Sequence, residues 1–421
     1  MEPLKLYFDF RDIFRSPRLA LSGKKIWIFL TANLIGFSVY FILNYLGYLA
    51  SGLSLVNTWN NYGLYPCLAG TGSPWFSMLL FWIGTIFWFL AISMACTAVA
   101  RVTYKQLKGD EFYSSFDGWK YVKKHWHPVV FTSLSIFLII CFFIIMAALF
   151  ALLGKIPFIG EYLFVLPYLL YFFGAVFTIY TAVVFIISFI YTPAITAALE
   201  EDTMGAVFNS YSLTWSQPWR ILTYHLVLLP LLTLSVSVFK YFWLGGFKFI
   251  NAVFGHASLM GEKLSNITGT AAGIIWPNRL THLFSHNSGF GPKGSYYGEY
   301  HGSSETCFSW FCDSSFPTAG DTLSGSEWGA AVILSFFLFI LTLSVFSYAL
   351  SILSVGETIM LIIFRKKSDD DNILERKDEE DLEAEEEDED FDVENETNNS
   401  TSENDSDDTG PGSGPERKDG K

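Results

Sequence analysis

Charged residues are missing from six long stretches of this sequence. Only 16% of the 421 residues are charged, whereas 51% are hydrophobic. The uncharged stretches cover residues 26–55, 75–100, 128–154, 162–199, 221–239 and 328–356. Each meets or approaches the roughly 20 residues that a helix needs to cross a bilayer, and none has the polar face of a soluble helix. The missing charge argues against an ordinary soluble domain and predicts six transmembrane helices.

Basic residues are scarce in alternate connections between these stretches. No Lys or Arg lies between Ser51 and Pro74, and the connection at 154–161 has only Lys155. Basic residues gather instead before the first stretch, between the second and third, and after the sixth, where Arg365, Lys366 and Lys367 follow one another. By the positive-inside rule, this asymmetry predicts that both termini are cytoplasmic and that residues 240–327 lie outside.

Familiar catalytic signatures are also absent. The sequence has no zinc-protease helix motif, phosphate-binding glycine loop, dinucleotide fingerprint or Ser-His-Asp order. The spans contain almost no ionisable side chain, apart from His225 and Glu357 near their ends. We expect His225 to be a packed, hydrogen-bonded histidine rather than a proton relay. Glu357 is expected to pair with Arg101 or Arg365 rather than to bind a substrate. The sequence predicts no catalytic residue and no cofactor.

Cysteine is rare, with five residues in the chain. Cys96 and Cys141 fall within predicted spans, whereas Cys67, Cys307 and Cys312 fall in segments predicted to lie outside, where a disulfide among them can form. The nearest approach to a zinc site is formed by His282, His286, His301, Cys307 and Cys312. Their spacing matches no standard zinc module, so no metal ligand is predicted. The sequence leaves the disulfide and the metal open.

Aromatic and polar residues alternate in three short segments that precede the first, third and fifth spans. These segments read YFDFRDIFRSPRLALSGKKIW, EFYSSFDGWKYVKKHW and GAVFNSYSLTWSQPW. In them, apolar residues recur at helical spacing beside charges, a pattern typical of a helix that lies in the membrane interface. We therefore predict an all-α membrane fold, in which six transmembrane helices form three hairpins, each preceded by a cytoplasmic interfacial helix.

An acidic cluster, Glu200–Asp202, follows the fourth span. We expect these carboxylates to lie in a solvated turn or to pair with Lys105 and Arg101, although a ligand site is the alternative. Pro193, just before them, has no N–H to donate and favours a kink or a fresh helix start.

Polar and helix-breaking residues inside the spans bear on transport. Asn33 and Asn44 in the first span can bond across helices, and Pro167, Pro193 and Pro230 can break helices near the middle of the membrane. A water-filled path lined by these residues would favour a permease.

The segments FRSPRLALSGKKIW, AVARVTYKQLKGDEFYSSFDGWKYVKKHW and TPAITAALEEDTMGAVFNSYSLTWSQPWRILTYHLV resemble a group of polytopic bacterial inner-membrane proteins. They are more distantly similar to the membrane domains associated with glycerophosphodiester phosphodiesterases. The resemblance covers about residues 10–250 and the last span, and it implies a helical membrane fold with no particular activity. The phosphodiesterase catalytic barrel is absent, so the enzymology of that family does not carry over.

The net negative charge of the chain comes from its last residues, 368–421. Residues 368–421 hold 24 Asp or Glu against 5 Lys or Arg, a net charge of −19, and because the whole chain carries −14 the rest carries +5. Such a segment buries too little apolar surface to fold and repels anionic lipid and nucleic acid. It suits a basic soluble protein as partner or loosely held divalent cations, or it is a solubilising extension with no partner.

The sequence thus divides into five parts. They are a cytoplasmic amphipathic segment (1–25), five transmembrane helices with interfacial helices at 110–126 and 203–219 (26–239), an extracytoplasmic loop region (240–327), a sixth transmembrane helix (328–364) and a disordered acidic tail (368–421). The function that fits best is a non-enzymatic organiser of lipids or proteins in the bilayer. A permease for a neutral or amphiphilic small molecule is the alternative, and a membrane enzyme or metal-dependent sensor fits least well.

Overall fold

The computed structural model describes residues 6–67, 74–275, 324–378 and 380–382, and no strand occurs in these ranges. Six of the helices are long and apolar enough to cross a membrane. They are α2 (Gly23–Ala50), α4 (Trp75–Lys108), α6 (Trp126–Leu153), α8 (Tyr168–Leu199), α10 (Pro218–Phe254) and α13 (Gly325–Asp369). The predicted all-α membrane fold with six transmembrane helices is confirmed.

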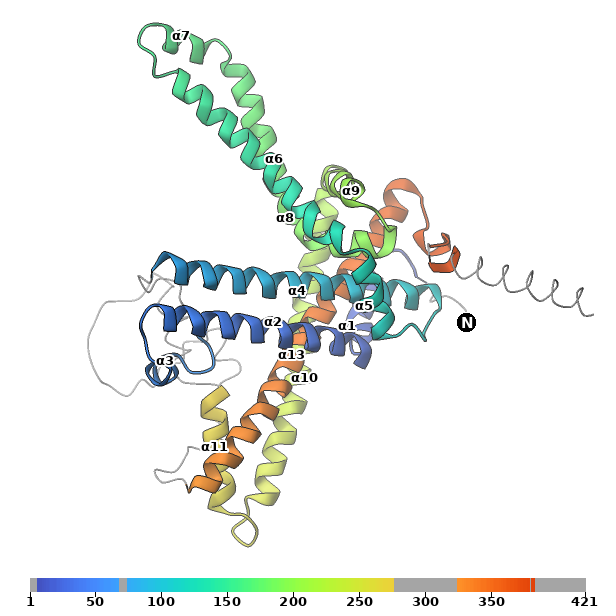
Figure 1. Ribbon diagram of the computed structural model, residues 1–421. Helices are drawn as coiled ribbons and strands as arrows, with labels where there is room; N and C mark the ends of the chain where they lie inside the picture. The colour runs from blue at the N-terminus through green and yellow to red at the C-terminus, as the bar shows by residue number, and fades with distance from the viewer. Residues whose placement is uncertain (1–5, 68–73, 276–323, 379, 383–421) are drawn as a thin grey trace, which may run out of the picture. The chain divides into compact units, whose positions relative to one another are not determined.

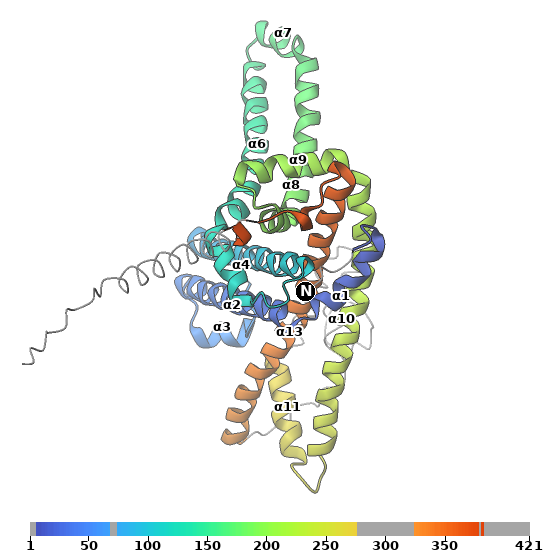
Figure 2. The ribbon, with the colours of Figure 1, turned by 90° about the vertical axis from the view of Figure 1, so that its right-hand side faces the viewer.

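The six long helices pair in chain order (Figures 1 and 2). Helix α2 packs along α4, α6 along α8, and α10 along α13. Short helices stand in the connections: α3 (Leu55–Tyr62) after α2, α7 (Ile159–Val165) between α6 and α8, and α11 (Glu262–Ile275) after α10. Helix α11 also packs against α13. The predicted three hairpins are therefore present.

Short helices precede each hairpin, as the sequence predicted. They are η1 (Phe10–Arg15) and α1 (Ser16–Ala20) before α2, α5 (Ser115–Lys124) before α6, and α9 (Thr203–Ser216) before α10. Helices α5 and α9 are shorter than the predicted 110–126 and 203–219, and local chemistry explains where they begin. Ser114 and Asp117 form a reciprocal capping box at the start of α5, and the Asp202 side chain accepts the Gly205 N–H at the start of α9.

Helix α10 runs beyond the predicted end of the fifth span at residue 239. It continues to Phe254, so the first part of the predicted 240–327 loop region is helical. Gly245 and Gly246 lie inside this helix rather than in a turn, because apolar neighbours on both sides continue the helical pattern. Helix α11 (Glu262–Ile275) follows in the same region, and residues 276–323 lie outside the described residues.

The three prolines have different positions in their helices. Pro167 is the N-cap residue of α8, whereas Pro193 and Pro230 lie inside α8 and α10. The fresh helix start predicted at Pro193 is wrong, since α8 continues without interruption to Leu199. The Ser188 and Thr192 hydroxyls bond to each other at 3.0 Å in the turn before Pro193.

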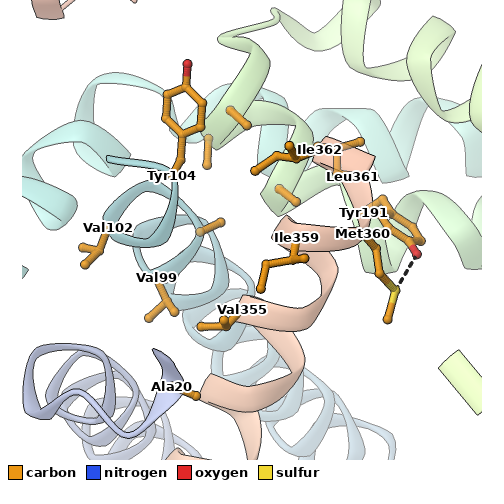
Figure 3. Close-up of a cluster of buried hydrophobic side chains, with 14 of the residues drawn as sticks. Ala20, Val99, Val102, Tyr104, Tyr191, Val355, Ile359, Met360, Leu361 and Ile362 are labelled. Carbon is orange, nitrogen blue, oxygen red and sulfur yellow. Dashed lines mark hydrogen bonds between the residues drawn. The ribbon is translucent and has the colours of Figure 1, made fainter. Parts of the chain in front are cut away.

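The main core lies where three helices end. We call this region the hub and define it as residues 95–107 of α4, 191–199 of α8 and 351–364 of α13. Helices α4, α8 and α13 all contact one another, and almost every hub residue is buried. Figure 3 shows Val99 of α4 beside Val355 of α13, and the Tyr191 hydroxyl of α8 bonded to Met360 of α13. The long helices exceed the roughly 20 residues of a span, and this extra length builds the hub.

The chain divides into two compact units, residues 1–374 and 375–421. All of the helices named above belong to the first unit. In the second, the structure describes residues 375–378 and 380–382, and the remainder of the predicted acidic tail lies outside the described residues.

Candidate functional site

A buried ion pair holds the hub ends of α4 and α8 together. Arg101 of α4 is fully buried, its Nη1 donates to the Ala197 carbonyl at 3.0 Å, and its Nη2 lies 2.9 Å from Glu200 Oε1. The guanidinium also lies over the Tyr121 ring of α5, 4.3 Å from its centroid. The charge thus has an anion, a carbonyl and an aromatic face as partners, as a buried arginine requires. The predicted pairing of the acidic cluster with Arg101 is confirmed.

The turn that places Glu200 is a helix C-cap. Glu200 has φ 55°, a left-handed conformation that ends α8 and turns its side chain back to Arg101. Gly109 ends α4 and Asp370 ends α13 in the same conformation. Because Asp202 caps α9, two of the three acidic residues have structural partners. The alternative of a ligand site made by the trio finds no support in these contacts.

The second helices of the three hairpins, α4, α8 and α13, continue into the hub. Tyr121 attaches α5 to the hub. The Tyr121 hydroxyl donates to the Thr196 carbonyl of α8 at 2.7 Å. A Cβ at Gly118 would lie 3.3 Å from the Ala98 carbonyl oxygen, so α5 approaches α4 closely at this glycine. Helix α5 is therefore fixed to the hub on one face, and its other face is exposed.

Glu357 does not pair as predicted. Arg101 pairs with Glu200, and Arg365 bonds Asn209 through its side chain, so neither guanidinium is joined to Glu357. Among the described residues, Glu357 makes no hydrogen bond or ion pair, although Cys96 and Tyr191 lie near enough to interact with its charge. The prediction fails because Glu200, the C-cap residue of α8, pairs with Arg101, and Asn209 of α9 bonds Arg365.

His225 of α10 is a packed histidine, as predicted. Its Nδ1 lies 2.8 Å from the Ile221 carbonyl oxygen in the preceding turn. Its ring meets the Tyr191 ring edge-on, with 5.8 Å between centroids. Its Nε2 has no hydrogen-bond partner among the described residues. These contacts give the ring one hydrogen bond and an aromatic neighbour, without the chain of polar groups that a proton relay needs.

The two asparagines of α2 behave differently. Asn33 Oδ1 accepts the indole N–H of Trp88 in α4 at 3.2 Å, which confirms a bond across helices. Asn44 Nδ2 donates instead to the Tyr40 carbonyl of its own helix. Asn33 is therefore part of the α2–α4 contact, beside the close approach of Gly36 to Trp88.

The predicted external His and Cys residues, His282, His286, His301, Cys307 and Cys312, lie outside the described residues. Cys67 is described and forms no disulfide with another described cysteine. No group of three or more potential metal ligands occurs within residues 6–67, 74–275, 324–378 and 380–382.

Exposed aromatic side chains mark the short helices beside the hub. Before and within α5, Phe112 and Phe116 are 83% and 74% exposed, and in α9 Phe208 and Trp215 are 67% and 79% exposed. Phe10 and Phe14 of η1 are also exposed. Large aromatic faces of this kind, beside polar residues, suit the boundary between water and lipid.

The full burial of Arg101 was not predicted from the sequence. Arg101 was expected to pair with the acidic cluster or with Glu357, and not to lie in the core. The sequence held a signal for this burial, since Arg101 lies between Ala100 and Val102 in an apolar run, and the next charged residue, Lys105, comes one helical turn later.

Comparison with protein-family models, curated proteins and solved structures found no match to this chain. The resemblance to polytopic bacterial inner-membrane proteins remains a prediction, and the functional argument rests on the geometry.

Proposed function

We propose that this chain is a multi-pass protein of a bacterial inner membrane and that it organises lipids or proteins there without catalysing a reaction. In this proposal both termini are cytoplasmic, and the hub lies on the cytoplasmic side. The observation that carries it is the set of short helices that flank the hub, each with one face packed and the other lined by exposed aromatic residues. Such faces bind lipid headgroups or the apolar face of a partner.

The use of the charged side chains supports the same proposal. Arg101 and Glu200 neutralise each other, Asp202 and Asp117 cap helices, and Arg365 bonds Asn209. Groups that are committed to structural contacts are not arranged as a nucleophile and base. A basic soluble protein is the partner we propose for the acidic tail, residues 368–421.

Affinity purification in a mild detergent tests this function. Three forms are compared: the full-length chain, a chain ending at Lys367, and a full-length Phe208→Ser/Trp215→Ser variant. Mass spectrometry identifies the proteins and lipids that co-purify with each form. Phe172→Ser/Phe173→Ser, which alters two exposed aromatics of α8, is the matched control. We expect the amount of lipid or protein that co-purifies with the α9 variant to fall at least about fivefold, because Phe208 and Trp215 each bury a large ring on binding. We expect the truncated chain to lose only the tail's protein partner.

A second readout separates the organiser from the permease. The purified protein in sealed vesicles is expected to release a panel of neutral solutes no faster than protein-free vesicles do. Faster release that Asn33→Leu alters would favour the permease and overturn the proposed function.

A further inference from the structure

The connection between α2 and α4 contains a short segment without regular structure. Helix α3 lies beside the end of α2 (Figures 1 and 2) and ends at Tyr62. Gly63 follows with φ 59°, a left-handed conformation that suits glycine. Residues 65–67 then belong to neither a helix nor a strand. We call residues 63–67 the strap.

Tyrosine hydroxyls of α2 hold the backbone of the strap. Each donates to one strap carbonyl: Tyr45 to Gly63 at 2.7 Å, Tyr40 to Pro66 at 2.6 Å and Tyr48 to Cys67 at 2.7 Å. Backbone outside regular structure leaves carbonyl oxygens without partners, and a bilayer has no water to supply them. Pro66 also lacks an N–H group that would need an acceptor. The strap carbonyls therefore have partners that do not depend on water.

The bond to Tyr40 sets the depth of the strap. Tyr40 lies ten residues before Ala50, where α2 ends, and this is about 15 Å along a helix. It is also at the middle of the uncharged run 26–55. Helical side chains lean toward the N-terminus, so the hydroxyl lies no closer to the end of α2 than its own backbone does. The Tyr65 ring meets the ring of Phe37, with 6.0 Å between centroids. The strap therefore reaches about half-way along the span.

The composition of the connection agrees with this depth. Residues 51–74 contain no Asp, Glu, Lys, Arg or His. The corresponding connection of the second hairpin, residues 154–161, is shorter and contains both Lys155 and Glu161. A charged side chain is costly inside a bilayer, so a long connection free of charge suits a segment that enters it.

Protein surrounds the strap on two sides. Leu64 packs against a buried cluster that includes Ala271 of α11 and Leu338 of α13. Cys67 packs against a second cluster, which includes Phe81 of α4. Irregular backbone occurs at membrane depth where protein encloses it, and these contacts of the first and third hairpins provide that enclosure.

We propose that the strap is a re-entrant segment, which enters the bilayer from the face where α2 ends, is anchored by the tyrosine hydroxyls of α2, and ties the first hairpin to the third. The two hairpins are thereby joined away from the hub as well as in it. The connection of the second hairpin differs, since its Phe158 and Leu166 are exposed. The inference goes beyond the proposed function, and it requires only that α2 crosses a membrane, whichever face is cytoplasmic.

The depth of a nitroxide spin label at Cys67 tests the proposal. Full-length protein in lipid nanodiscs carries the label at Cys67, at Cys141 or at Glu111→Cys, each in a chain whose other cysteines are serine. Cys141 is at the middle of the uncharged run 128–154, and Glu111 is an exposed charged residue outside the spans. Electron paramagnetic resonance compares collisions of each label with oxygen, which concentrates in lipid, and with a neutral nickel chelate, which stays in water.

We expect the ratio of oxygen to chelate collisions at Cys67 to exceed that at Glu111→Cys at least about fivefold and to approach that at Cys141, because hydrocarbon excludes a polar solute. Because a ratio is used, crowding by neighbouring side chains lowers both collision rates without imitating depth. A ratio at Cys67 equal to that at Glu111→Cys overturns the proposal: the end of α2 would then project from the bilayer, and the strap would be an external loop.

Removal of two hydroxyls tests the anchoring. Tyr40→Phe/Tyr48→Phe keeps both rings and removes the bonds to Pro66 and Cys67. In nanodiscs of the reduced protein with its native cysteines, mass spectrometry follows the labelling of Cys67 by a sulfonated maleimide. We expect labelling about tenfold faster than in the wild type, the ratio that two modest hydrogen bonds supply.

Tyr162→Phe/Tyr168→Phe is the matched control, because it alters two exposed tyrosines of the second hairpin. The labelling rate of Cys67 should not change in this variant. Equal rates in the two double variants would show that the tyrosine hydroxyls do not anchor the strap and would overturn that part of the proposal, whatever the spin label reports.

Discussion

The hub and the far part of the α6–α8 hairpin are both apolar, and they differ completely in burial. In the hub segment of α13, residues 351–364, only Leu353 and Glu357 are not fully buried. In the far hairpin, residues 141–178, Gly160 is the only residue in the buried class. Leu166 and Leu169 there are 89% and 68% exposed. Two largely apolar regions therefore differ in their surroundings: other helices enclose the hub, whereas the far hairpin has a surface that suits lipid.

This difference assigns different sources of stability to the two regions. Hub residues gain from contacts with other helices and from fixed polar pairs such as Arg101–Glu200. Far-hairpin residues gain from lipid, which covers apolar side chains without any partner helix. Substitutions should therefore be costly in the hub for reasons of packing and charge, and costly in the far hairpin only when they make it polar.

Loss of the hub's arginine is expected to have the largest effect. Arg101→Ala leaves Glu200 beside an apolar hub without its counter-charge and removes a group stacked on Tyr121. Breaking a buried ion pair from one side costs about 3–5 kcal/mol. We expect the free energy of unfolding in detergent to fall by about 4 kcal/mol, measured by thermal or denaturant unfolding of the purified protein.

Lys120→Ala is the control for this prediction, because Lys120 is a basic residue on the exposed face of α5. Its effect should stay within about 0.5 kcal/mol. Arg101→Ala/Glu200→Ala should recover part of the loss, since the unpaired carboxylate is then gone. An Arg101→Ala protein as stable as the wild type would show that the ion pair does not hold the hub together.

A charge placed in the far hairpin is expected to have the next largest effect. Ile145 lies about one turn from the centre of the predicted span 128–154 and is 58% exposed, so Ile145→Arg puts a guanidinium into lipid. An arginine at the centre of a span costs about 3 kcal/mol in insertion experiments. We expect a smaller membrane-integrated fraction after alkaline washing. Phe112→Arg, at a more exposed position outside the spans, should leave that fraction unchanged.

If Ile145→Arg integrates as well as the wild type does, the far hairpin faces water or a polar partner rather than lipid. The comparison with the hub would then fail, because the exposed apolar side chains of the far hairpin would no longer indicate a surface that faces lipid.

Much of this architecture was predictable from the sequence. The uncharged runs identified all six spans, and aromatic periodicity identified α5 and α9, because both signals are local. The pairing of the acidic cluster with Arg101 was predicted as well, as one of two expected environments for that cluster. The division between hub and far hairpin was not, because hydropathy reports the cost of exposure to water and is the same for a protein-facing leucine and a lipid-facing one.

The contacts of α9 and of the residue before α10 with α13 were beyond prediction for another reason. Gln217 bonds Phe364, and Asn209 bonds Arg365, across more than 140 residues of chain. No spacing rule connects such positions, so only the packing of α13 against α8 and α10 reveals them.

Adding a side chain at a glycine tests the difference in packing between the hub and the far hairpin, and the expected effect on stability is intermediate in size. A Cβ at Gly356 in the hub would lie 2.8 Å from two methyl carbons of Leu228, which is itself fully buried in α10. Gly174 in the far hairpin has no atom within 4 Å of the same position. Overpacking costs about 1–3 kcal/mol, so Gly356→Val should destabilise by about 2 kcal/mol and Gly174→Val by much less. Unfolding of both variants in the same detergent measures the difference, and equal losses would count against the contrast.

The smallest expected effect concerns the asparagines of α2. Asn33 bonds Trp88 in the neighbouring helix, whereas Asn44 bonds only its own helix and leaves Oδ1 without a partner. Hydrogen bonds between membrane helices average about 0.6 kcal/mol, so Asn33→Leu should lower stability by about that amount. Asn44→Leu should be neutral or stabilising, because it removes an unsatisfied buried oxygen. The two variants carry the same substitution in the same helix, so a difference in their unfolding free energies isolates the bond to Trp88. Equal losses would mean that the asparagine amides act through their own helix, and that contacts between α2 and α4 rest on packing alone.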